Sequence, residues 1–374
     1  MRYLYKNILK DLTRKMVFIG GPRQVGKTTL AKNILEQAYP SGKYFNWDYN
    51  EDRQDLLAAK WLDDDGLIIF DELHKYRDWK NWIKGIYDTN EGAVQFLVTG
   101  SARLDIYRRG GDSLLGRYHY WRLHPFGFDE CPGNMTPKEV LKRLMTVGGF
   151  PEPFLDGDER EARRWRRERF DRVLKEDIRD LESIRHISLL DLFIHQLRTC
   201  VGSLIVMSNI AGEIQVSPKT AKNWLDLLER MYLVFAVRPY TKNLPRAVIK
   251  PPKIYFYDNG DVMGDEGAVF ENLVATQLLK KNHFREDRDG YRYELRYIRD
   301  KEGREVDFVI LKEGIIEELI EVKFSDDRIS KHLKYYADKL SPRKATQIVA
   351  KLKRPYSSGR MTVVDPAAYF MPGL

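Results

Sequence analysis

The residues with the strongest chemical signature lie in one glycine-rich loop near the start of the chain. The pattern G-x-x-x-x-G-K-[ST] is met in full by Gly21, Pro22, Arg23, Gln24, Val25, Gly26, Lys27 and Thr28, with Thr29 next. Glycines let backbone N–H groups curl around phosphate oxygens, Lys27 brings a positive charge to the outer phosphates, and Thr28 offers a hydroxyl to Mg²⁺. An apolar run precedes the loop and a helical run follows, the context that the motif requires. The loop therefore predicts binding of ATP, with Mg²⁺ as the metal.

Two acidic residues, Asp71 and Glu72, end the apolar run 67–70. We expect Asp71 to hold Mg²⁺ through water, and Glu72 to polarise the water that attacks the nucleotide. The alternative is an ordinary strand that is followed by a helix-capping aspartate. Beside a complete phosphate loop, the catalytic interpretation is favoured.

Two further residues are candidates for the same reaction. Ser101 follows the apolar run 95–99 and is expected to orient the water or contact the γ-phosphate, with Thr99 as the second candidate. Arg117 is a candidate sensor, or an arginine finger that one subunit of a homo-oligomer offers to its neighbour. The alternative for Arg117 is a surface arginine in a loop.

A second set of charged residues lies near the C-terminus. Glu321 and Lys323 share one face of an apolar strand, and Asp307 lies fourteen residues earlier on another strand. Glu271 lies upstream on an amphipathic helical stretch. In this order the four residues resemble the core of the PD-(D/E)xK nucleases. The resemblance implies that Glu271, Asp307 and Glu321 bind a divalent metal and that Lys323 assists cleavage. A descendant that packs or binds DNA without cutting it is the open alternative.

The elements that must position these residues fall into three regions. Residues 1–150 alternate strand-like and helical runs, which is typical of an α/β domain. Residues 151–252 are mainly helical, and the stretch 208–239 resembles a helix-turn-helix with a wing. Its second helix exposes Lys219, Lys222 and Asn223, although a winged helix that serves only for packing is at least as well supported as one that binds DNA. From residue 253 to 374 strands and helices alternate again.

Composition excludes several classes of protein. The 374 residues include 63 Lys and Arg against 55 Asp and Glu, a net charge of +8. With 43% hydrophobic residues the chain is neither collagen-like nor disordered. No apolar run approaches the length of about 18 residues that a membrane span needs, so we expect no membrane partner. Cys131 and Cys200 form no metal motif, and we expect a cytoplasmic protein.

Four segments together carry a wider resemblance: GPRQVGKTTL, FDELHKYRDWKNWIKGIYD, VTGSARLD and GGFPEPF. They resemble a broad family of bacterial and archaeal AAA-type ATPases with a C-terminal region of unknown function. The resemblance implies an α/β P-loop NTPase domain, followed by a helical, winged-helix middle domain and a restriction-nuclease-like C-terminal domain. It also implies ATP hydrolysis through the loop, Asp71 and Glu72.

Two functions are compatible with these features. The first is a Mg²⁺-dependent ATPase that acts on DNA through its winged helix and nuclease-like domain. The second is an ATP-dependent regulatory switch that binds a protein partner, with an inactive nuclease-like domain.

Overall fold

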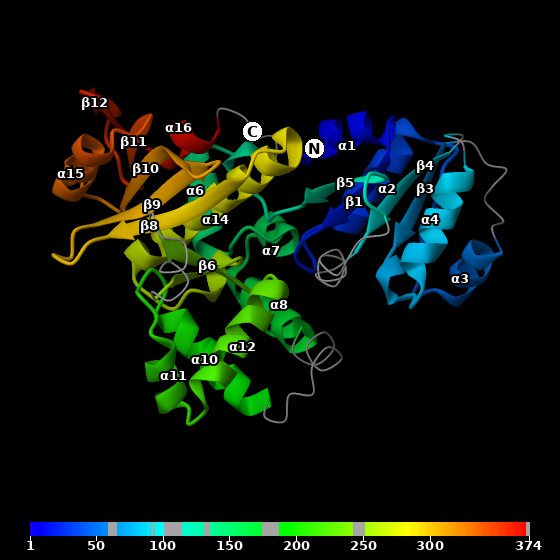
Figure 1. Ribbon diagram of the computed structural model, residues 1–374, viewed down its shortest axis with the longest axis horizontal. Coiled ribbons are helices and arrows are strands. Elements are labelled where there is room, and N and C mark those ends of the chain that lie inside the picture. The colour runs from blue at the N-terminus through cyan, green and yellow to red at the C-terminus, as the bar shows by residue number, and fades with distance from the viewer. Residues whose placement is uncertain are drawn as a thin grey trace. The chain divides into compact units, whose positions relative to one another are not determined.

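A computed structural model describes residues 1–58, 66–90, 92, 94–100, 114–130, 135–173, 187–241 and 251–371 (Figure 1). These residues form two compact units, Met1–His124 and Pro125–Leu374. Each unit is built on one β-sheet, and helices accompany both sheets. The expected mixed α/β architecture is therefore confirmed.

The first unit contains a five-stranded sheet in the order β2-β3-β4-β1-β5, in which every pair of neighbours is parallel. The strands are β1 (Met16–Gly20), β2 (Lys43–Asn46), β3 (Gly66–Asp71), β4 (Val94–Thr99) and β5 (Tyr118–Arg122). The helices are α1 (Tyr5–Leu12), α2 (Lys27–Ala38), α3 (Asn50–Leu57) and α4 (Trp79–Thr89), with a 3₁₀ turn η1 (Leu73–Lys75).

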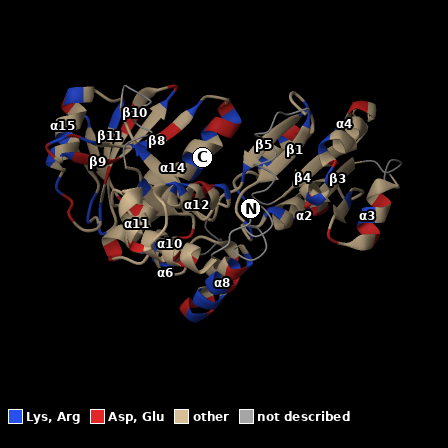
Figure 2. Cartoon of the chain, turned by 60° about the horizontal axis from the view of Figure 1, so that its bottom comes forward, with Lys and Arg blue, Asp and Glu red and all other residues tan. Residues whose placement is uncertain are grey.

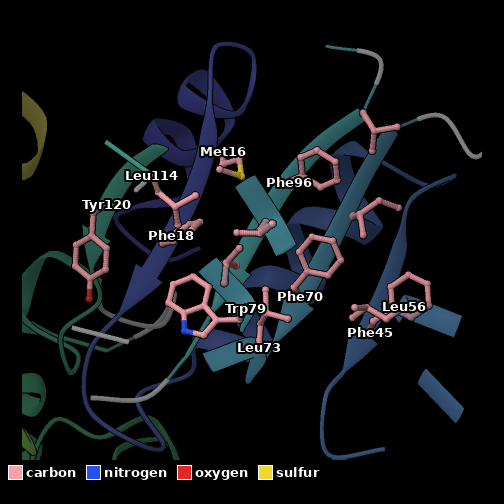
Figure 3. Close-up of a cluster of buried hydrophobic side chains, with 14 residues drawn as sticks. Met16, Phe18, Phe45, Leu56, Phe70, Leu73, Trp79, Phe96, Leu114 and Tyr120 are labelled. Carbon is pink, nitrogen blue, oxygen red and sulfur yellow. The ribbon is translucent and has the colours of Figure 1, made fainter. Parts of the chain in front are cut away.

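The central strands β1, β3 and β4 of this sheet are buried along almost all of their length. All five residues of β1 are buried, as are Leu67–Asp71 of β3, which explains why these strands read as unbroken apolar runs. Figure 3 shows one core cluster, in which Phe18, Phe70 and Phe96 from three strands pack with Trp79 of α4. This packing fixes the strand ends from which the loop and the acidic residues emerge.

The second unit contains an eight-stranded sheet in the order β12-β13-β11-β10-β9-β8-β6-β7. Its central strands β8, β9 and β10 are antiparallel, whereas β11 is parallel to β10 and β6 is parallel to β8. The strands are β6 (Val234–Pro239), β7 (Lys253–Phe256), β8 (Tyr293–Arg299), β9 (Glu305–Lys312), β10 (Ile315–Lys323), β11 (Lys344–Val349), β12 (Tyr356–Ser358) and β13 (Met361–Val364).

The described residues of this unit contain eleven helices, two of which are 3₁₀ turns. They are η2 (Phe128–Glu130), α6 (Pro137–Thr146), α7 (Pro151–Asp156), α8 (Glu159–Arg172), α10 (Ile187–Thr199), α11 (Met207–Glu213), α12 (Pro218–Arg230), η4 (Asn259–Asp261), α14 (Glu266–Asp289), α15 (Lys331–Leu340) and α16 (Pro366–Phe370). The longest is α14, which begins at the capping side chain of Asp265 and ends at Gly290 in the left-handed conformation.

The expected domain boundaries at 150 and 252 stay predictions. The first compact unit ends at His124, before the first expected boundary. Strand β6 precedes the second boundary, yet it pairs with β7 and β8, which follow it. The chain after His124 thus shares one sheet.

Candidate functional site

The glycine-rich loop connects β1 to α2. Gly21 and Gly26 have φ values of +133° and +92°, a region that favours glycine, and Gly26 directly precedes the first residue of α2. A Cβ atom on Gly21 would lie 2.3 Å from the carbonyl oxygen of Leu123, so a side chain there would clash with backbone. The loop therefore has the tight turn and open helix N-terminus that phosphate binding requires.

Lys27 folds back over this loop. Its side chain is only 7% exposed, and its Nζ donates to the carbonyl oxygens of Gly21 at 3.1 Å and Pro22 at 2.6 Å. Both acceptors are neutral backbone groups. These two hydrogen bonds add no negative charge, and the Lys27 ammonium group also interacts electrostatically with the Glu72 carboxylate.

Asp71 lies at the carboxyl end of β3 and accepts hydrogen bonds from three hydroxyl groups. The Thr28 Oγ1 and the Tyr44 hydroxyl each donate to its Oδ2 at 2.7 Å, and Thr99 donates to its Oδ1. The pairing of β3 with β2 and β4 places Asp71 beside Asn46 and Thr99. Three neutral donors orient the carboxylate without cancelling its charge, which suits a ligand of Mg²⁺ or of its bound water.

Glu72 adopts a left-handed backbone conformation, with φ +58° and ψ +21°. This conformation is uncommon for a residue other than glycine, and strained backbone of this kind tends to cluster at functional sites. Burial raises the pKa of its carboxyl group, although the charge of Lys27 opposes the shift. Its Oε2 lies 3.5 Å from Nε2 of His74. This buried Glu72 oxygen accepts no hydrogen bond within the described structure. A carboxylate oxygen in that state can accept a hydrogen bond from water.

The structure brings some of the predicted nucleotide-site residues together and separates one from them. Thr28 contacts Asp71, and Glu72 follows it directly. Arg117 precedes β5 at the opposite, amino edge of the parallel sheet, where its carbonyl accepts from the Met16 amide at 3.2 Å. One five-residue strand, about 15 Å, separates it from the loop of its own chain. Its guanidinium binds Asp88 through two bonds of 2.6 and 3.0 Å.

Two other candidates have different outcomes. Ser101 lies outside the described residues. Thr99, the second candidate, is fully buried and binds Asp71. Tyr44 was missed from the sequence, because a tyrosine in a short strand carries no motif and only the pairing of β2 with β3 brings it to Asp71.

A second charged centre lies in the C-terminal sheet. It unites Glu271 of α14, Glu305 and Asp307 of β9, and Lys253 and Tyr255 of β7. The Lys253 Nζ lies 2.5 Å from Glu305 Oε1, 3.3 Å from Glu271 Oε1 and 3.6 Å from Asp307 Oδ1. The Tyr255 hydroxyl donates to Glu271 Oε1 at 2.7 Å. We name these five residues the Lys253 centre.

Glu321 and Lys323 lie next to this centre on β10. The Lys323 Nζ is 2.8 Å from Glu321 Oε1, whereas the buried Glu321 Oε2 makes no hydrogen bond within the described structure. The Val322 amide donates to Asp307 Oδ2 at 2.8 Å, which brings the Asp307 carboxylate to β10 beside Glu321.

The electrostatics of the carboxyl groups reflect their closeness. Burial and the neighbouring charge of Asp307 raise the pKa of both Glu271 and Glu321 to about 7. Burial alone would lower the pKa of Lys253, but Glu271, Asp307 and Glu305 raise it overall. Lys253 therefore carries a positive charge at neutral pH.

The predicted set of Glu271, Asp307, Glu321 and Lys323 thus lies in one region of the sheet. Within the described ranges, no group of three Asp, Glu, His or Cys side chains is arranged to hold a metal ion. The metal assignment stays a prediction. Sequence analysis missed Lys253 and Glu305, although strand period places Glu305 on the same face as Asp307.

Helices α10, α11 and α12 precede β6 and β7, which pair in antiparallel fashion. Ser217 caps α12, and Pro218 occupies its first position. Lys219, Lys222 and Asn223 are exposed on α12. Glu229 turns the other way, because its Oε1 accepts from the amide of Ala236 in β6 at 2.9 Å. The exposed start of α12 therefore carries positive charge.

The arginine-rich helix α8 does not form a comparable surface. Arg164 pairs with Glu161 at 3.0 Å, and Arg169 is buried beside Asp258 and Asp261. Figure 2 shows both signs of charge along the helix. These contacts make α8 a helix with a mixed, salt-bridged face.

No described helix is both long enough and apolar enough to span a membrane.

Three family models match successive parts of the chain. Residues 13–131 match an AAA domain, residues 138–262 match a domain of unknown function (DUF8612), and residues 266–369 match another domain of unknown function (DUF4143). The chain thus combines an AAA-type ATPase domain with two domains of unknown function.

Curated relatives extend this similarity without naming an activity. Uncharacterized proteins of Mycobacterium bovis and Mycobacterium tuberculosis are each 26% identical over 252 residues, which cover 66% of this chain and 54% of theirs. An uncharacterized protein of Methanocaldococcus jannaschii is 22% identical, with 71% of this chain and 68% of its own covered. The chain thus spans about half the length of the mycobacterial relatives.

Solved structures resemble the chain only distantly. The Thermotoga maritima RuvB Holliday junction branch migration motor is 16% identical, with a TM-score of 0.31 over 66% of this chain and 94% of its own. Bacteroides Pif1 bound to ssDNA is 17% identical, with a TM-score of 0.24 over 41% of this chain and 47% of its own. Scores this low support no argument about function.

Proposed function

We propose that this protein is a Mg²⁺-dependent ATPase that acts on DNA through a winged helix and a nuclease-like C-terminal domain. The observation that carries the ATPase part is the contact between loop and acidic strand, where Thr28 donates to Asp71 at 2.7 Å. The same strand end supplies Glu72. A phosphate loop, a metal ligand and a carboxylate base thus share one edge of the sheet.

The residues present fit ATP with Mg²⁺. Thr28 and Asp71 would hold Mg²⁺, directly or through water, and the ion would neutralise charge on the phosphates. Lys27 would exchange its two carbonyl acceptors for phosphate oxygens. Glu72 would accept a proton from the attacking water. The oxygen of that water would form a bond to the γ-phosphorus, while the bond from that phosphorus to the β–γ bridging oxygen breaks. ADP then leaves with the electron pair of that bond.

Substitution of Lys27 tests the nucleotide site. Lys27→Ala should abolish ATP hydrolysis, because it removes the charge that pairs with the outer phosphates. Lys6→Ala, which changes an exposed lysine on α1, is the matched control and should hydrolyse ATP normally. Wild-type turnover in Lys27→Ala would refute the assignment of the loop.

The exposed start of α12 supports the DNA part of the proposal. Lys219 and Lys222 lie three residues apart on the helix that would enter the major groove of a DNA site. Lys219→Glu with Lys222→Glu should weaken DNA binding and flatten its salt dependence, because two phosphate contacts are lost. The control is Lys331→Glu with Lys334→Glu, an exposed pair with the same spacing at the start of α15. Equal losses in both double variants would refute a specific DNA surface on α12.

A neighbouring copy is required if Arg117 acts on the nucleotide, since its own loop lies at the far edge of the sheet. We propose that Arg117 acts in trans within a homo-oligomer. Arg117→Ala should then bind ATP but turn it over slowly, whereas Asp88→Ala should keep turnover because Arg117 remains. Mixing Arg117→Ala with Lys27→Ala should restore part of the activity. Normal turnover by a strictly monomeric wild-type protein would rule out the trans role.

The element order α14, β8, β9, β10, α15 and β11 supports a nuclease-like C-terminal domain, with three antiparallel strands and a fourth in parallel. The contacts of Lys253 favour the second candidate function for this domain, in which it no longer cleaves DNA. ATP turnover that is stimulated by DNA would favour action on DNA. DNA-independent turnover together with a co-purifying protein would favour a regulatory switch.

A further inference from the structure

We infer that Lys253 is the built-in cation of the C-terminal acidic centre, so that its ammonium group neutralises the carboxylates for which a nuclease would use a divalent metal. The inference concerns the C-terminal sheet alone and does not depend on ATP hydrolysis. It assigns a structural, metal-free state to residues whose order resembles a metal-dependent nuclease.

The first argument is the position of the ammonium group. Lys253 is 2% exposed, so its charge cannot reach solvent and must be balanced inside the protein. Its Nζ faces one oxygen from each of Glu271, Glu305 and Asp307, at 3.3, 2.5 and 3.6 Å. An ammonium group has three N–H donors and no acceptor. Three carboxylate oxygens thus surround a group with three hydrogens to give.

The second argument is that two of the three carboxylates around Lys253, those of Asp307 and Glu305, have partners on both oxygens, while Glu271 accepts from Lys253 and Tyr255 on its Oε1. Asp307 uses Oδ1 for Lys253 and Oδ2 for the Val322 amide. Glu305 uses Oε1 for Lys253 and Oε2 for Arg299, at 2.9 Å. A divalent ion needs these same oxygens at 2.0–2.6 Å. It would therefore have to displace Lys253 or lie beside a fixed positive charge.

The third argument is that the backbone holds Lys253 in place. It pairs with Val237 in the β6–β7 hairpin and bridges to Leu204. Because the side chain begins on a paired strand and is buried along its length, it cannot swing into solvent without exposing the cluster. A mobile lysine side chain could move aside for a metal ion. The Lys253 side chain is held by its paired backbone at one end and by the carboxylates at the other.

The fourth argument comes from Glu321, the predicted metal ligand that Lys253 does not contact. Its Oε1 binds Lys323, and its buried Oε2 has no hydrogen-bond donor within the described structure. The positive charge of Lys253 thus neutralises Glu271, Glu305 and Asp307 rather than Glu321. Glu321 thus contributes a buried oxygen that Lys253 does not neutralise, and one oxygen by itself does not hold a metal.

Mn²⁺ binding to the full chain tests the inference. The parent protein carries Lys27→Ala, and Mn²⁺ is added without nucleotide and followed by electron paramagnetic resonance. Adding Asp307→Asn to the parent should change Mn²⁺ affinity by less than twofold. Adding Lys253→Met should raise it at least tenfold, because a carboxylate cluster loses its internal cation. Adding both changes should remove that gain.

A matched control distinguishes loss of this particular cation from loss of any positive charge. Arg299→Met removes the outer partner of Glu305 but leaves Lys253, so Mn²⁺ affinity should stay at the parent value. A comparable gain in Arg299→Met would overturn the inference. So would a folded Lys253→Met protein with no gain.

The parent protein decides the matter even where Lys253→Met fails to fold. A parent affinity for Mn²⁺ that Asp307→Asn lowers at least tenfold would show that the metal already binds beside Lys253. Metal-dependent cleavage of plasmid DNA that Asp307→Asn abolishes would overturn the inference equally. Lys253→Gln, which keeps a polar side chain of similar reach, is the second variant for the gain of Mn²⁺ affinity.

Discussion

Two buried lysines lie beside carboxylates in the two units of this chain, and they differ in what holds them. Lys27 donates to two backbone carbonyls, whereas Lys253 faces three carboxylates. Neutral acceptors orient an ammonium group and leave its charge available for an arriving anion. Carboxylate acceptors neutralise the charge of the ammonium group. Burial of a lysine is therefore compatible with a binding site in one unit and with a closed ion-pair network in the other.

The carboxylates show the same contrast. Asp71 is oriented by the hydroxyls of Thr28, Tyr44 and Thr99, which leave its negative charge for a cation. Asp307 has an ammonium group at one oxygen and an amide at the other. The same residue types can thus form a site whose charge is available to a ligand, or a site whose charges are neutralised within the protein. The difference lies in whether the partners are neutral.

The largest expected effect separates two buried glutamates, each with an oxygen that lacks a hydrogen-bond donor in the described structure. Glu72→Gln should slow ATP hydrolysis about 10²- to 10⁴-fold while ATP still binds, because the attacking water loses its base. Glu321→Gln should leave hydrolysis unchanged, since it lies in the other sheet. Steady-state turnover with a nucleotide-binding assay measures both. Wild-type turnover in Glu72→Gln would show that another group activates the water.

The next effect concerns stability and compares the two lysines directly. Lys253→Met should lower the free energy of unfolding by about 3–5 kcal/mol, because it leaves the buried carboxylates without a counter-charge. Lys27→Met should cost less than about 1.5 kcal/mol, since the two hydrogen bonds that it removes end on neutral carbonyl groups beside an open loop. Urea unfolding of both variants measures the difference. Equal losses would contradict the distinction between the two sites.

The smallest effect compares two tyrosines that each donate to a buried carboxylate. Tyr44→Phe and Tyr255→Phe remove hydrogen bonds of 2.7 Å to Asp71 and Glu271, and each should cost about 1.5–3 kcal/mol of unfolding free energy. Saturating MgATP should offset the loss in Tyr44→Phe, because the metal takes over the orientation of Asp71. It should not offset the loss in Tyr255→Phe. Thermal unfolding with and without MgATP would reveal the difference, and an equal response of both variants would contradict it.

The sequence determined those parts of the site that are formed by residues adjacent to one another along the chain. The loop from Gly21 to Thr28 is contiguous, so its turn, its lysine and its helix start follow from local geometry. Asp71 and Glu72 likewise end one buried strand, and the apolar run before them predicts where they emerge. Helix α14 shows the limit even here, because it runs on through the polar residues 285–289 before it ends. A polar segment gives no signal to stop until Gly290 permits the left-handed turn.

Only the tertiary structure decided the partners that come from distant segments. Tyr44 reaches Asp71 because β2 pairs with β3, and Lys253 reaches Asp307 because the β6–β7 hairpin joins the C-terminal sheet through β8. Arg117 lies far from its own loop because β5 runs parallel to β1 and begins at the opposite edge. Strand order depends on which apolar faces pack best across the whole core, and no local pattern encodes it. The sequence therefore specified which charged groups are present, and the sheet order determined which of them neutralise one another.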